Sequence, residues 1–346
     1  MYKRLIRPLL FCLNPESVHL LVANSLRILF VIPGLRLLVR KTLRVNDSRI
    51  TRTVFGLKFP SPVGLAAGFD KDAKLISEMD ALGFGFIEVG TVTPKGQPGN
   101  PKPRSFRLPE DQALVNRMGF NNLGLEAAVA KLAKRRKKII VGGNIGKNTL
   151  TPNSRAVEDY AEVFQGLYPY VDYFVVNVSC PNISDLHELQ ESDELSSILS
   201  QLTKLRSQQA QFRPILLKVS PDLSLDQATK QVKTAMQFGL DGIVATNTTR
   251  SREGLVTPEV KVNSLGSGGL SGKPLFEKSI KLVEHIYSIT GGKLPIVGVG
   301  GIMSEKDALD MLKAGASLIQ VYTGFIYNGP CFVRRINRAI IKANVD

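Results

Sequence analysis

The sequence predicts a (β/α)8 TIM barrel that follows a small N-terminal helical domain. Eight apolar runs rich in β-branched residues recur from residue 62 onward, each with Gly, Thr, Asn or Ser near its end. Segments with helical periodicity separate these runs. Repeated alternation of strand and helix is typical of a closed parallel barrel, whose strands are apolar because both faces of the sheet are covered. The predicted strands are 62–68, 85–91, 138–146, 172–180, 214–220, 242–248, 295–302 and 318–324.

The segments between these strands predict the outer helices and the upper loops of the barrel. Apolar residues recur at helical spacing in 73–82, 123–134, 157–167, 225–238 and 305–314. Three gaps are longer than one crossover helix requires, namely 92–137, 181–213 and 249–294. Extra length at the top of a barrel usually forms lids and pocket walls. We divide the chain into a helical domain, residues 1–45, and a barrel domain, residues 46–346.

The N-terminal domain predicts a pair of helices. Asn14 is a typical helix cap, Pro15 suits the first helical position, and residues 1–13 predict a shorter preceding helix. The longest uninterrupted apolar run, 28–35, has eight residues, whereas a membrane span needs about 20. The apolar stretch before Asn14 is too short for a signal peptide. Two interpretations stay open: a helix pair that lies in a membrane interface, and a helical cap packed on the barrel.

The charge of the chain indicates an acidic partner. The net charge is +15, and residues 1–52 carry ten Lys or Arg against two acidic residues. Because the sequence contains no zinc finger, RNP-like aromatic motif or basic region with heptads, we expect no nucleic-acid partner. Three cysteines without CxxC spacing and three scattered histidines predict neither a disulfide framework nor a metal site. A reducing compartment fits this cysteine usage.

The chemistry of such a barrel lies at the carboxyl ends of its strands, and here those ends carry amides, lysines and one thiol. Cys180 follows an apolar run and lies between the amides Asn177 and Asn182. A free cysteine is usually a core residue. A thiol that can lose its proton also serves as a base, and flanking amides can hold a planar polar ligand beside it. Polar residues at the other strand ends include Lys71, Thr91, Asn144, Lys218, Thr246, Asn247 and Thr248.

Glycines at the last two strands predict a phosphate site. Residues 298–301 (GVGG) and 322–324 (YTG) end the strands at which barrels of this kind bind phosphate through backbone amides. A ligand with one phosphate and a planar body that bonds several amides fits flavin mononucleotide (FMN), and Lys218 could stabilise negative charge on its reduced ring. A sugar phosphate is the competing ligand. A lysine that reaches solvent is the competing interpretation of Lys218.

The order of the motifs then closely resembles dihydroorotate dehydrogenase over nearly the whole chain. The segment 14–19 (NPESVH) is similar to the helical domain of the membrane-associated class 2 enzymes, which pass electrons to quinone. The motifs that carry the resemblance are 66–71 (AAGFDK), 90–94 (GTVTP), 116–122 (NRMGFNN), 144–148 (NIGKN), 177–182 (NVSCPN), 245–249 (ATNTT) and 268–272 (GGLSG).

The resemblance implies one FMN per subunit, dihydroorotate as substrate, orotate as product and membrane quinone as acceptor, in de novo pyrimidine (UMP) biosynthesis. The implied FMN ligands are Ala67, Gly68, Lys71, Thr91, Asn144, Asn177, Lys218, Thr246, Gly272, Gly301, Tyr322 and Thr323. The implied dihydroorotate ligands are Lys71, Asn116, Arg117, Met118, Gly119, Phe120, Asn177, Asn182, Asn247 and Thr248. Residues that match the quinone tunnel are His19, Arg107 and Tyr322.

In the family, a hydride moves from C6 of dihydroorotate to flavin N5 while a base removes the C5 proton. Cys180 occupies the base position, where class 2 enzymes normally carry serine and the soluble class 1 enzymes carry cysteine. Ile183 stands where a threonine supports the serine, and 184–187 (SDLH) where Pro-Gly-Leu-Arg is usual, so the usual hydroxyl relay is not expected. A thiol with a pKa of about 8.5 is ionised to roughly a few per cent at neutral pH, which makes the replacement chemically sensible.

The resemblance also implies a monomer bound peripherally, through its N-terminal helices, to the cytoplasmic face of a bacterial cytoplasmic (inner) membrane. The absence of a transit segment before these helices favours that location. Three alternatives remain to be weighed against it. They are a dihydroorotate dehydrogenase that uses fumarate or NAD as acceptor, a sugar-phosphate isomerase, and an inactive barrel that serves as a binding module at a membrane surface.

Overall fold

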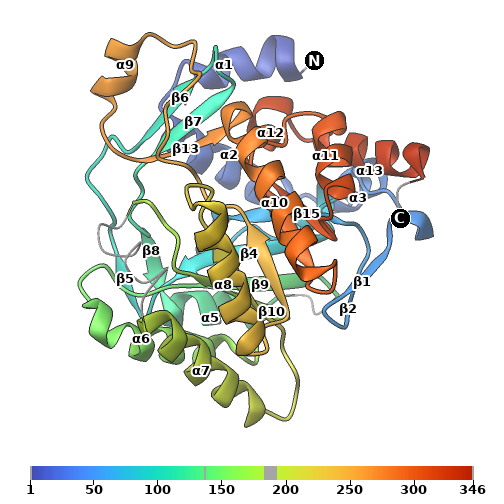
Figure 1. The fold of residues 1–346 in the computed structure, drawn as a ribbon. Coiled ribbons are helices and arrows are strands. Elements are labelled where there is room, and N and C mark those ends of the chain that lie inside the picture. Colours follow the sequence, from blue (N-terminus) through green and yellow to red (C-terminus); the bar gives the residue numbers. More distant parts are fainter. Residues whose placement is uncertain (1, 136–137, 183–192, 345–346) are drawn as a thin grey trace.

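The computed structural model describes residues 2–135, 138–182 and 193–344, and its centre is a closed barrel of parallel strands (Figure 1). The strand order around the barrel is β10-β11-β12-β14-β15-β3-β4-β9. All the predicted strands are confirmed. Their bounds are β3 (Val63–Asp70), β4 (Phe86–Val92), β9 (Ile140–Ile145), β10 (Tyr173–Asn177), β11 (Ile215–Val219), β12 (Gly242–Ala245), β14 (Ile296–Val299) and β15 (Leu318–Val321).

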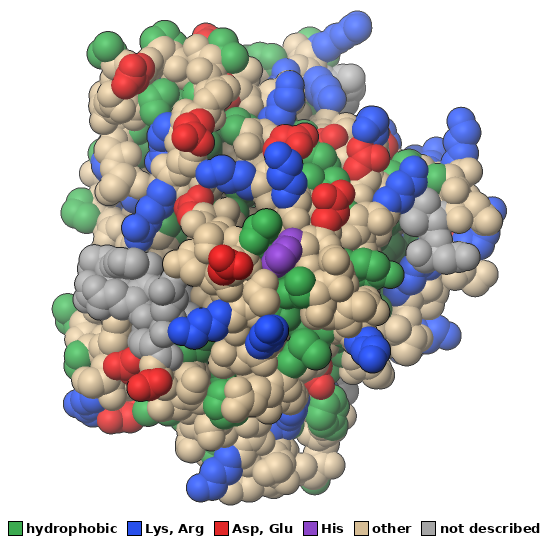
Figure 2. All heavy atoms as spheres, in the orientation of Figure 1, with side chains coloured by type: hydrophobic (Ala, Val, Ile, Leu, Met, Phe, Trp, Pro, Cys, Tyr) green, Lys and Arg blue, Asp and Glu red, His purple; other side chains and the backbone are tan. Residues whose placement is uncertain are grey.

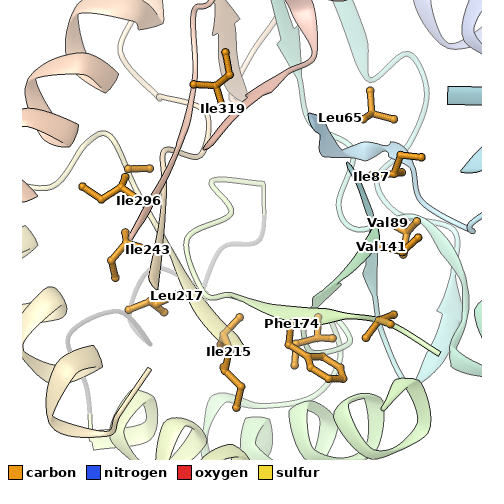
Figure 3. Close-up of a cluster of buried hydrophobic side chains, with 14 of the residues drawn as sticks. Leu65, Ile87, Val89, Val141, Phe174, Ile215, Leu217, Ile243, Ile296 and Ile319 are labelled. Carbon is orange, nitrogen blue, oxygen red and sulfur yellow. The ribbon is translucent and has the colours of Figure 1, made fainter. Parts of the chain in front are cut away.

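Helices cover the outside of the barrel. Side chains such as Ile87, Leu217 and Ile243 are buried and belong to the apolar layer between the strands and these helices (Figure 3). The helices at predicted segments are α4 (Ile76–Ala81), α5 (Leu125–Leu132), α6 (Ala156–Leu167), α8 (Leu225–Gln237) and α11 (Glu305–Lys313). The further helices are α7 (Asp193–Ser207), α10 (Phe276–Thr290), α12 (Thr323–Asn328) and α13 (Phe332–Ala343).

Side chains that alternate with these outward residues fill the interior of the barrel. Phe86, Tyr173 and Val244 are buried in this inner cluster. A hairpin that the sequence analysis did not predict, β1 (Arg52–Val54) and β2 (Leu57–Phe59), contributes to the same cluster. The Phe59 ring packs edge-on against Phe86, the first residue of β4, with ring centroids 5.1 Å apart. The hairpin therefore plugs the amino-terminal end of the barrel.

Short antiparallel strands occupy two of the three long gaps. β5 (Lys95–Gln97) pairs with β8 (Asn122–Gly124), and β6 (Ser105–Leu108), β7 (Ala113–Asn116) and β13 (Gly269–Gly272) form a separate sheet. We expected pocket walls from these gaps, and β7 and β13 contribute residues to the cavity described below. The remaining short elements of the described chain are η2 (Ser48–Ile50), η3 (Asn153–Arg155), α9 (Glu259–Ser264) and η5 (Lys273–Leu275).

The N-terminal segment forms η1 (Tyr2–Ile6), α1 (Arg7–Phe11), α2 (Pro15–Leu29) and α3 (Leu35–Leu43). The side-chain oxygen of Asn14 accepts hydrogen bonds from the backbone N–H of Glu16 (3.0 Å) and of Ser17 (3.4 Å). The predicted cap and start of α2 are therefore confirmed. Gly34 has a φ of +81°, which a glycine adopts readily, and it turns the chain into α3. Among the described helices, none is long and apolar enough to cross a bilayer.

Polar contacts hold these helices on the barrel. The Arg104 guanidinium donates from Nη2 to Glu16 Oε1 (2.8 Å) and from Nε to Glu16 Oε2 (3.2 Å), so it bridges the β5–β6 connection and α2. Arg107 Nη1 donates to Leu13 O (2.5 Å), at the turn before α2. One side of the N-terminal helices thus packs on the barrel, as the cap interpretation expects.

The other side of the N-terminal helices leaves apolar side chains in solvent. The face of the molecule drawn in Figure 2 is more mixed, because its Lys and Arg side chains are spread among acidic and apolar side chains. One side of the helices packs on the barrel, as expected of a cap, and the other exposes apolar side chains, as expected of a helix pair in a membrane interface. Their exposed apolar side chains are Leu5, Ile6, Leu9, Leu13, Leu20, Leu21, Ile28, Leu29, Val31, Ile32, Leu37 and Leu38.

We expect Phe59→Ala to lower the free energy of unfolding by about 3–5 kcal/mol, because the fully buried ring would leave a cavity in the plug. Chemical denaturation measures this loss. Phe212→Ala is the matched control, since Phe212 is 58% exposed and its truncation should cost less than about 1 kcal/mol. Equal losses in the two variants would contradict the role of Phe59 in the plug.

Candidate active site

One cavity of about 470 Å³ lies over the carboxyl ends of the barrel strands and continues between the barrel and α2. Strand ends and the loops that follow them supply its polar part. At its other end, α2 supplies Val18, Val22 and Leu26. A volume of this order is typical of a site for a small molecule. The walls therefore change from polar to apolar along a single continuous space.

The cavity brings together nearly all the residues assigned to ligands from the sequence. Asn144 lies beneath it and is fully buried. The Arg117 side chain turns away and donates to Pro103 O (3.0 Å) and Leu265 O (2.9 Å), so it does not reach a ligand in the cavity. The predicted residues that line the cavity are His19, Ala67, Gly68, Lys71, Thr91, Arg107, Asn116, Met118, Gly119, Phe120, Asn177, Cys180, Asn182, Lys218, Thr246, Asn247, Thr248, Gly272, Gly301, Tyr322 and Thr323.

A chain of hydrogen bonds forms the floor of the cavity, and along it each residue donates to the next one in the direction of Glu88. Asn247 Nδ2 donates to Asn177 Oδ1 (3.2 Å), and Asn177 Nδ2 donates to Thr91 Oγ1 (2.9 Å) and to Asn144 Oδ1 (3.3 Å). Thr91 Oγ1 also donates to Asn144 Oδ1 (2.5 Å). Asn144 Nδ2 then donates to Glu88 Oε1 (2.8 Å). These bonds hold the amides in fixed orientations below any ligand.

A second set of amide contacts lies on the wall near Cys180. Asn182 Nδ2 donates to Asn116 Oδ1 (2.8 Å), and Asn116 Nδ2 donates to Gly269 O (3.3 Å). The Gly269 backbone N–H donates to Asn182 Oδ1 (3.2 Å). These three contacts close a ring that joins the end of β7, the loop after β10 and the start of β13. They keep two amides side by side in the cavity wall.

Two lysines bring positive charge to the site. Lys71 Nζ donates to Gly68 O (2.9 Å), and Lys218 is 6% exposed at the end of β11. Burial lowers the pKa of Lys71 to about 8, and the positive charge of Arg104 acts in the same direction. Because burial disfavours the charged form, an anionic ligand beside Lys71 would favour its protonation. The site therefore suits a ligand that carries a carboxylate.

Cys180 is 7% exposed and lines the cavity. Burial raises the pKa of the Cys180 thiol to about 11, although the backbone N–H of Asn182 and the positive charge of Lys218 both lower it. The expectation of a thiol already ionised to a few per cent at neutral pH is therefore wrong for this site, since burial outweighs the neighbouring charge. Ile183 and residues 184–187, where the family pattern breaks, lie outside the described residues.

Close backbone packing marks the end of the cavity predicted to bind phosphate. Gly301 has a φ of +75°, and a Cβ there would lie 2.4 Å from the backbone N of Phe276, the first residue of α10. The hydroxyls of Ser271 and Thr323 lie 2.9 Å apart at the same end. This arrangement, together with the amide floor and Lys218, fits a planar heterocycle with a phosphate tail. The residues present are thus compatible with FMN.

Aromatic rings separate this polar region from α2. The Phe69 ring lies edge-on to His19 (ring centroids 4.8 Å apart) and to Tyr322 (5.3 Å). Burial lowers the pKa of His19 to about 4, so the imidazole is neutral at physiological pH. The Arg107 guanidinium lies 4.6 Å from the centroid of the Phe11 ring. Of the three residues predicted for a quinone tunnel, His19 and Tyr322 thus contact the same ring and Arg107 lies beside α1, and all three line the cavity.

Residues that support the site from below and from the side were not predicted from the sequence. Gln320 Nε2 donates to Glu88 Oε2 (2.6 Å), and both side chains are buried inside the barrel. A signal for Glu88 was present, because a single carboxylate interrupts an apolar strand (86–92, FIEVGTV). The pairing of Arg104 with Glu16 had no local signal, since the two residues are 88 positions apart.

The chain is similar to known proteins over nearly its whole length. The family model for dihydroorotate dehydrogenase matches residues 49–343. The chain is 52% identical over 342 residues to dihydroorotate dehydrogenase (quinone) of Christiangramia forsetii, covering 99% of each chain. It is 48% identical to the protein of the same name from Chloroflexus aurantiacus, covering 98% of this chain and 96% of that one. The crystal structure of DHODH from Eimeria tenella in complex with ferulenol has a TM-score of 0.83 and 35% identity, covering 95% of this chain and 91% of that one.

We expect Glu16→Gln to loosen α2 from the barrel. The hydrogen bond from Arg104 holds the pKa of Glu16 below its ordinary value of 4.5. Because the folded-state pKa is lowered, this contact stabilises docking above pH 4.5 and is lost as the pH falls further. Hydrogen exchange of the α2 amides at pH 7 should become about tenfold faster in the variant, because the buried Arg104 guanidinium loses its anionic partner and one of the two acceptor oxygens of that side chain.

Asp47→Asn is the control, because Asp47 also pairs with an arginine, Arg49, but in an exposed position outside the α2 contact. Its effect on α2 exchange should be negligible. Equal protection of α2 in the wild type and in Glu16→Gln would show that the Arg104 contact does not hold the helix.

Proposed function

Because the chain belongs to the dihydroorotate dehydrogenase family, we propose that it oxidises dihydroorotate to orotate and delivers the electrons to quinone. The observation that carries this proposal is the single cavity with two kinds of wall. Amides, lysines and a thiol at its barrel end suit a polar pyrimidine. The apolar side chains of α2 at its other end suit a lipid-soluble acceptor.

FMN is the cofactor that we assign to the barrel end, one per subunit. When bound, it accepts the hydride that leaves C6 of dihydroorotate. The glycines and hydroxyls of Gly272, Gly301 and Thr323 would hold its phosphate, since glycine permits close backbone approach to an anion. Asn177 and Lys218 would bond the polar edge of its ring, and Asn144 would act from beneath through Asn177.

Dihydroorotate would bind among the amides near Cys180. Asn116, Asn182 and Asn247 offer donors and acceptors that match the carbonyl and N–H groups of a pyrimidine. The Lys71 ammonium would pair with the substrate carboxylate, and this pairing would also favour the charged form of a lysine whose pKa burial lowers. We assign no direct contact to the Arg117 side chain.

Cys180 Sγ would accept the proton from C5 of the substrate. The cations Lys218 and Lys71 lower the pKa of the thiol against the stronger effect of burial. The small fraction of thiolate at neutral pH is therefore the reactive form, and its supply grows with pH. This view replaces the idea of a thiol already ionised in the resting enzyme.

The quinone would enter between α2 and the barrel, past His19, Arg107 and Tyr322. A neutral His19 and the aromatic rings beside it suit an uncharged, lipid-soluble molecule. The exposed apolar side chains of residues 1–45 support peripheral attachment of this helical domain to a membrane, with residues 46–346 as the catalytic domain. We place the protein as a monomer on the cytoplasmic face of a bacterial inner membrane.

A dihydroorotate dehydrogenase that reduces fumarate or NAD is the alternative. The apolar wall that α2 gives to the cavity disfavours a charged acceptor there. A sugar-phosphate isomerase is disfavoured by the row of amides and by the family membership. Rates of reoxidation of the dihydroorotate-reduced enzyme by quinone, fumarate and NAD identify the acceptor. Flavin absorbance of the purified protein distinguishes a flavoenzyme from a sugar-phosphate isomerase.

We expect the rate of flavin reduction by saturating dihydroorotate to rise with pH toward the pKa of Cys180, which burial raises to about 11 without ligand. Below that value the thiolate fraction grows about tenfold per pH unit. Cys180→Ala should reduce the rate about 100-fold or more, because the proton acceptor is lost. Stopped-flow bleaching of the flavin across pH measures both. A Cys180→Ser variant with an unchanged rate and pH profile would sink the assignment.

We expect Val22→Trp to raise the quinone KM or lower the rate of flavin reoxidation about tenfold, because the indole would fill the α2 end of the cavity. Flavin reduction by dihydroorotate should stay unchanged, since that step occurs at the other end. Leu21→Trp is the matched control: Leu21 is 52% exposed and does not line the cavity. Loss of both half-reactions in Val22→Trp, or equal effects of the two variants, would contradict separate ends for the two substrates.

A further inference from the structure

Glu88 is a buried carboxylate that the proposed reaction does not use. It lies on β4 between Ile87 and Val89, which belong to the outer apolar layer, so its side chain points into the barrel. It is fully buried and does not line the cavity. A carboxylate in such a place requires hydrogen-bond partners, because burying it unpaired would be costly.

Each carboxylate oxygen of Glu88 accepts one amide N–H. Asn144 Nδ2 donates to Oε1 (2.8 Å), and Gln320 Nε2 donates to Oε2 (2.6 Å). Asn144 lies on β9, which neighbours β4, whereas Gln320 lies on β15, which β3 separates from β4 in the barrel order. Gln320 lines the cavity, and Asn144 lies directly below Asn177, which also lines it. Glu88 is thus connected to the cavity through one residue, Gln320, on one side and through two, Asn144 and then Asn177, on the other.

The carboxylate is the member of this network that imposes a direction. An amide can exchange its donor and acceptor ends by turning over, and a hydroxyl can rotate, whereas an ionised carboxylate only accepts. Since Asn144 gives its N–H to Glu88, its Oδ1 must face Thr91 and Asn177. Asn177 must then donate from Nδ2 to Asn144, and its Oδ1 accepts a hydrogen bond from Asn247. Reversing any one amide would place donor against donor or acceptor against acceptor.

We propose that Glu88 is a positioning residue that sets the hydrogen-bond direction of the amides under the cofactor ring. It acts through Asn144 on Asn177 and Thr91, and directly on Gln320. This inference rests on the proposed function in so far as FMN is the ligand above those amides. Its consequence is that the pattern of donors and acceptors offered to the ring depends on a residue that touches neither cofactor nor substrate.

Glu88→Gln separates this role from simple space-filling, because the two side chains have nearly the same volume. A glutamine at position 88 can accept from only one of its two amide neighbours, since its other end carries an NH2 group. Either Asn144 or Gln320 must then turn over or lose its bond. The amides then offer the ring a changed pattern of donors and acceptors, so we expect the Kd for FMN to rise by about tenfold.

The double variant Glu88→Gln/Asn144→Asp restores the direction. The carboxylate at position 144 accepts from the glutamine at position 88 and from Asn177 and Thr91, while the glutamine oxygen accepts from Gln320. We expect its Kd for FMN to lie nearer that of the wild type than that of the single variant. Thr290→Val is the control for loss of a buried polar group, because Thr290 lies at the end of α10 away from Gly301. It should leave the Kd unchanged.

The experiment uses the full chain and measures three properties: the Kd for FMN by fluorescence quenching, the visible spectrum of the bound flavin, and its midpoint potential. The expected result is weaker binding, an altered spectrum and a more positive potential in Glu88→Gln, because a negative charge below the ring is lost. Recovery of the Kd and the spectrum in the double variant is expected as well.

Wild-type values for all three properties in Glu88→Gln would overturn the proposal, and so would a double variant no better than the single one. If Glu88→Gln does not fold, a folded double variant with a wild-type spectrum supports the proposal, and an unfolded one overturns it. A wild-type protein that binds FMN but is not reduced by dihydroorotate would refute the proposed function alone. A wild-type protein that binds no FMN would refute both.

Discussion

Side-chain alternation along parallel strands is the constraint on which the rest of this structure depends. In β4, Ile87 and Val89 belong to the apolar layer under the helices, whereas Phe86 and Glu88 point into the barrel. Two residues advance the chain by about 7 Å. Within that distance the barrel interior changes from packed rings around Phe86 to the hydrogen-bonded amides around Glu88. One two-residue repeat of β4 therefore separates the packed interior of the barrel from the hydrogen-bonded floor of the site.

A second constraint is the way in which the N-terminal helices join the barrel. Arg104 binds Glu16 of α2 through two nitrogens, and its backbone O accepts the N–H of Arg117 (2.9 Å). Its Nη1 also donates to Asn100 O (2.9 Å). One residue thus fixes α2 and the segment that precedes Met118 and Phe120. The α2 end and the amide-lined end of the cavity are consequently held in a fixed relation by the same side chain.

The features predicted from the sequence are those that depend on neighbours in the chain. The strand runs, the Asn14 cap and the polar strand ends were all evident because period and capping are local. The hairpin plug at Phe59 was not predicted, since its role appears only when the barrel closes. The pKa of Cys180 was misjudged for a similar reason, because burial depends on residues from several strands. Glu88 stood out in its run, but its partners lie 56 and 232 positions away.

The shared wall between α2 and the barrel has a consequence for the pharmacology of related enzymes. Val18, Val22 and Leu26 belong to a short helical segment outside the barrel, whereas the amides and Cys180 belong to the strand ends. Substitutions in that segment can reshape one end of the cavity while the amide-lined end stays the same. An inhibitor that discriminates between two such enzymes is therefore best sought among molecules that occupy the α2 end. Molecules that occupy the amide-lined end should affect both alike.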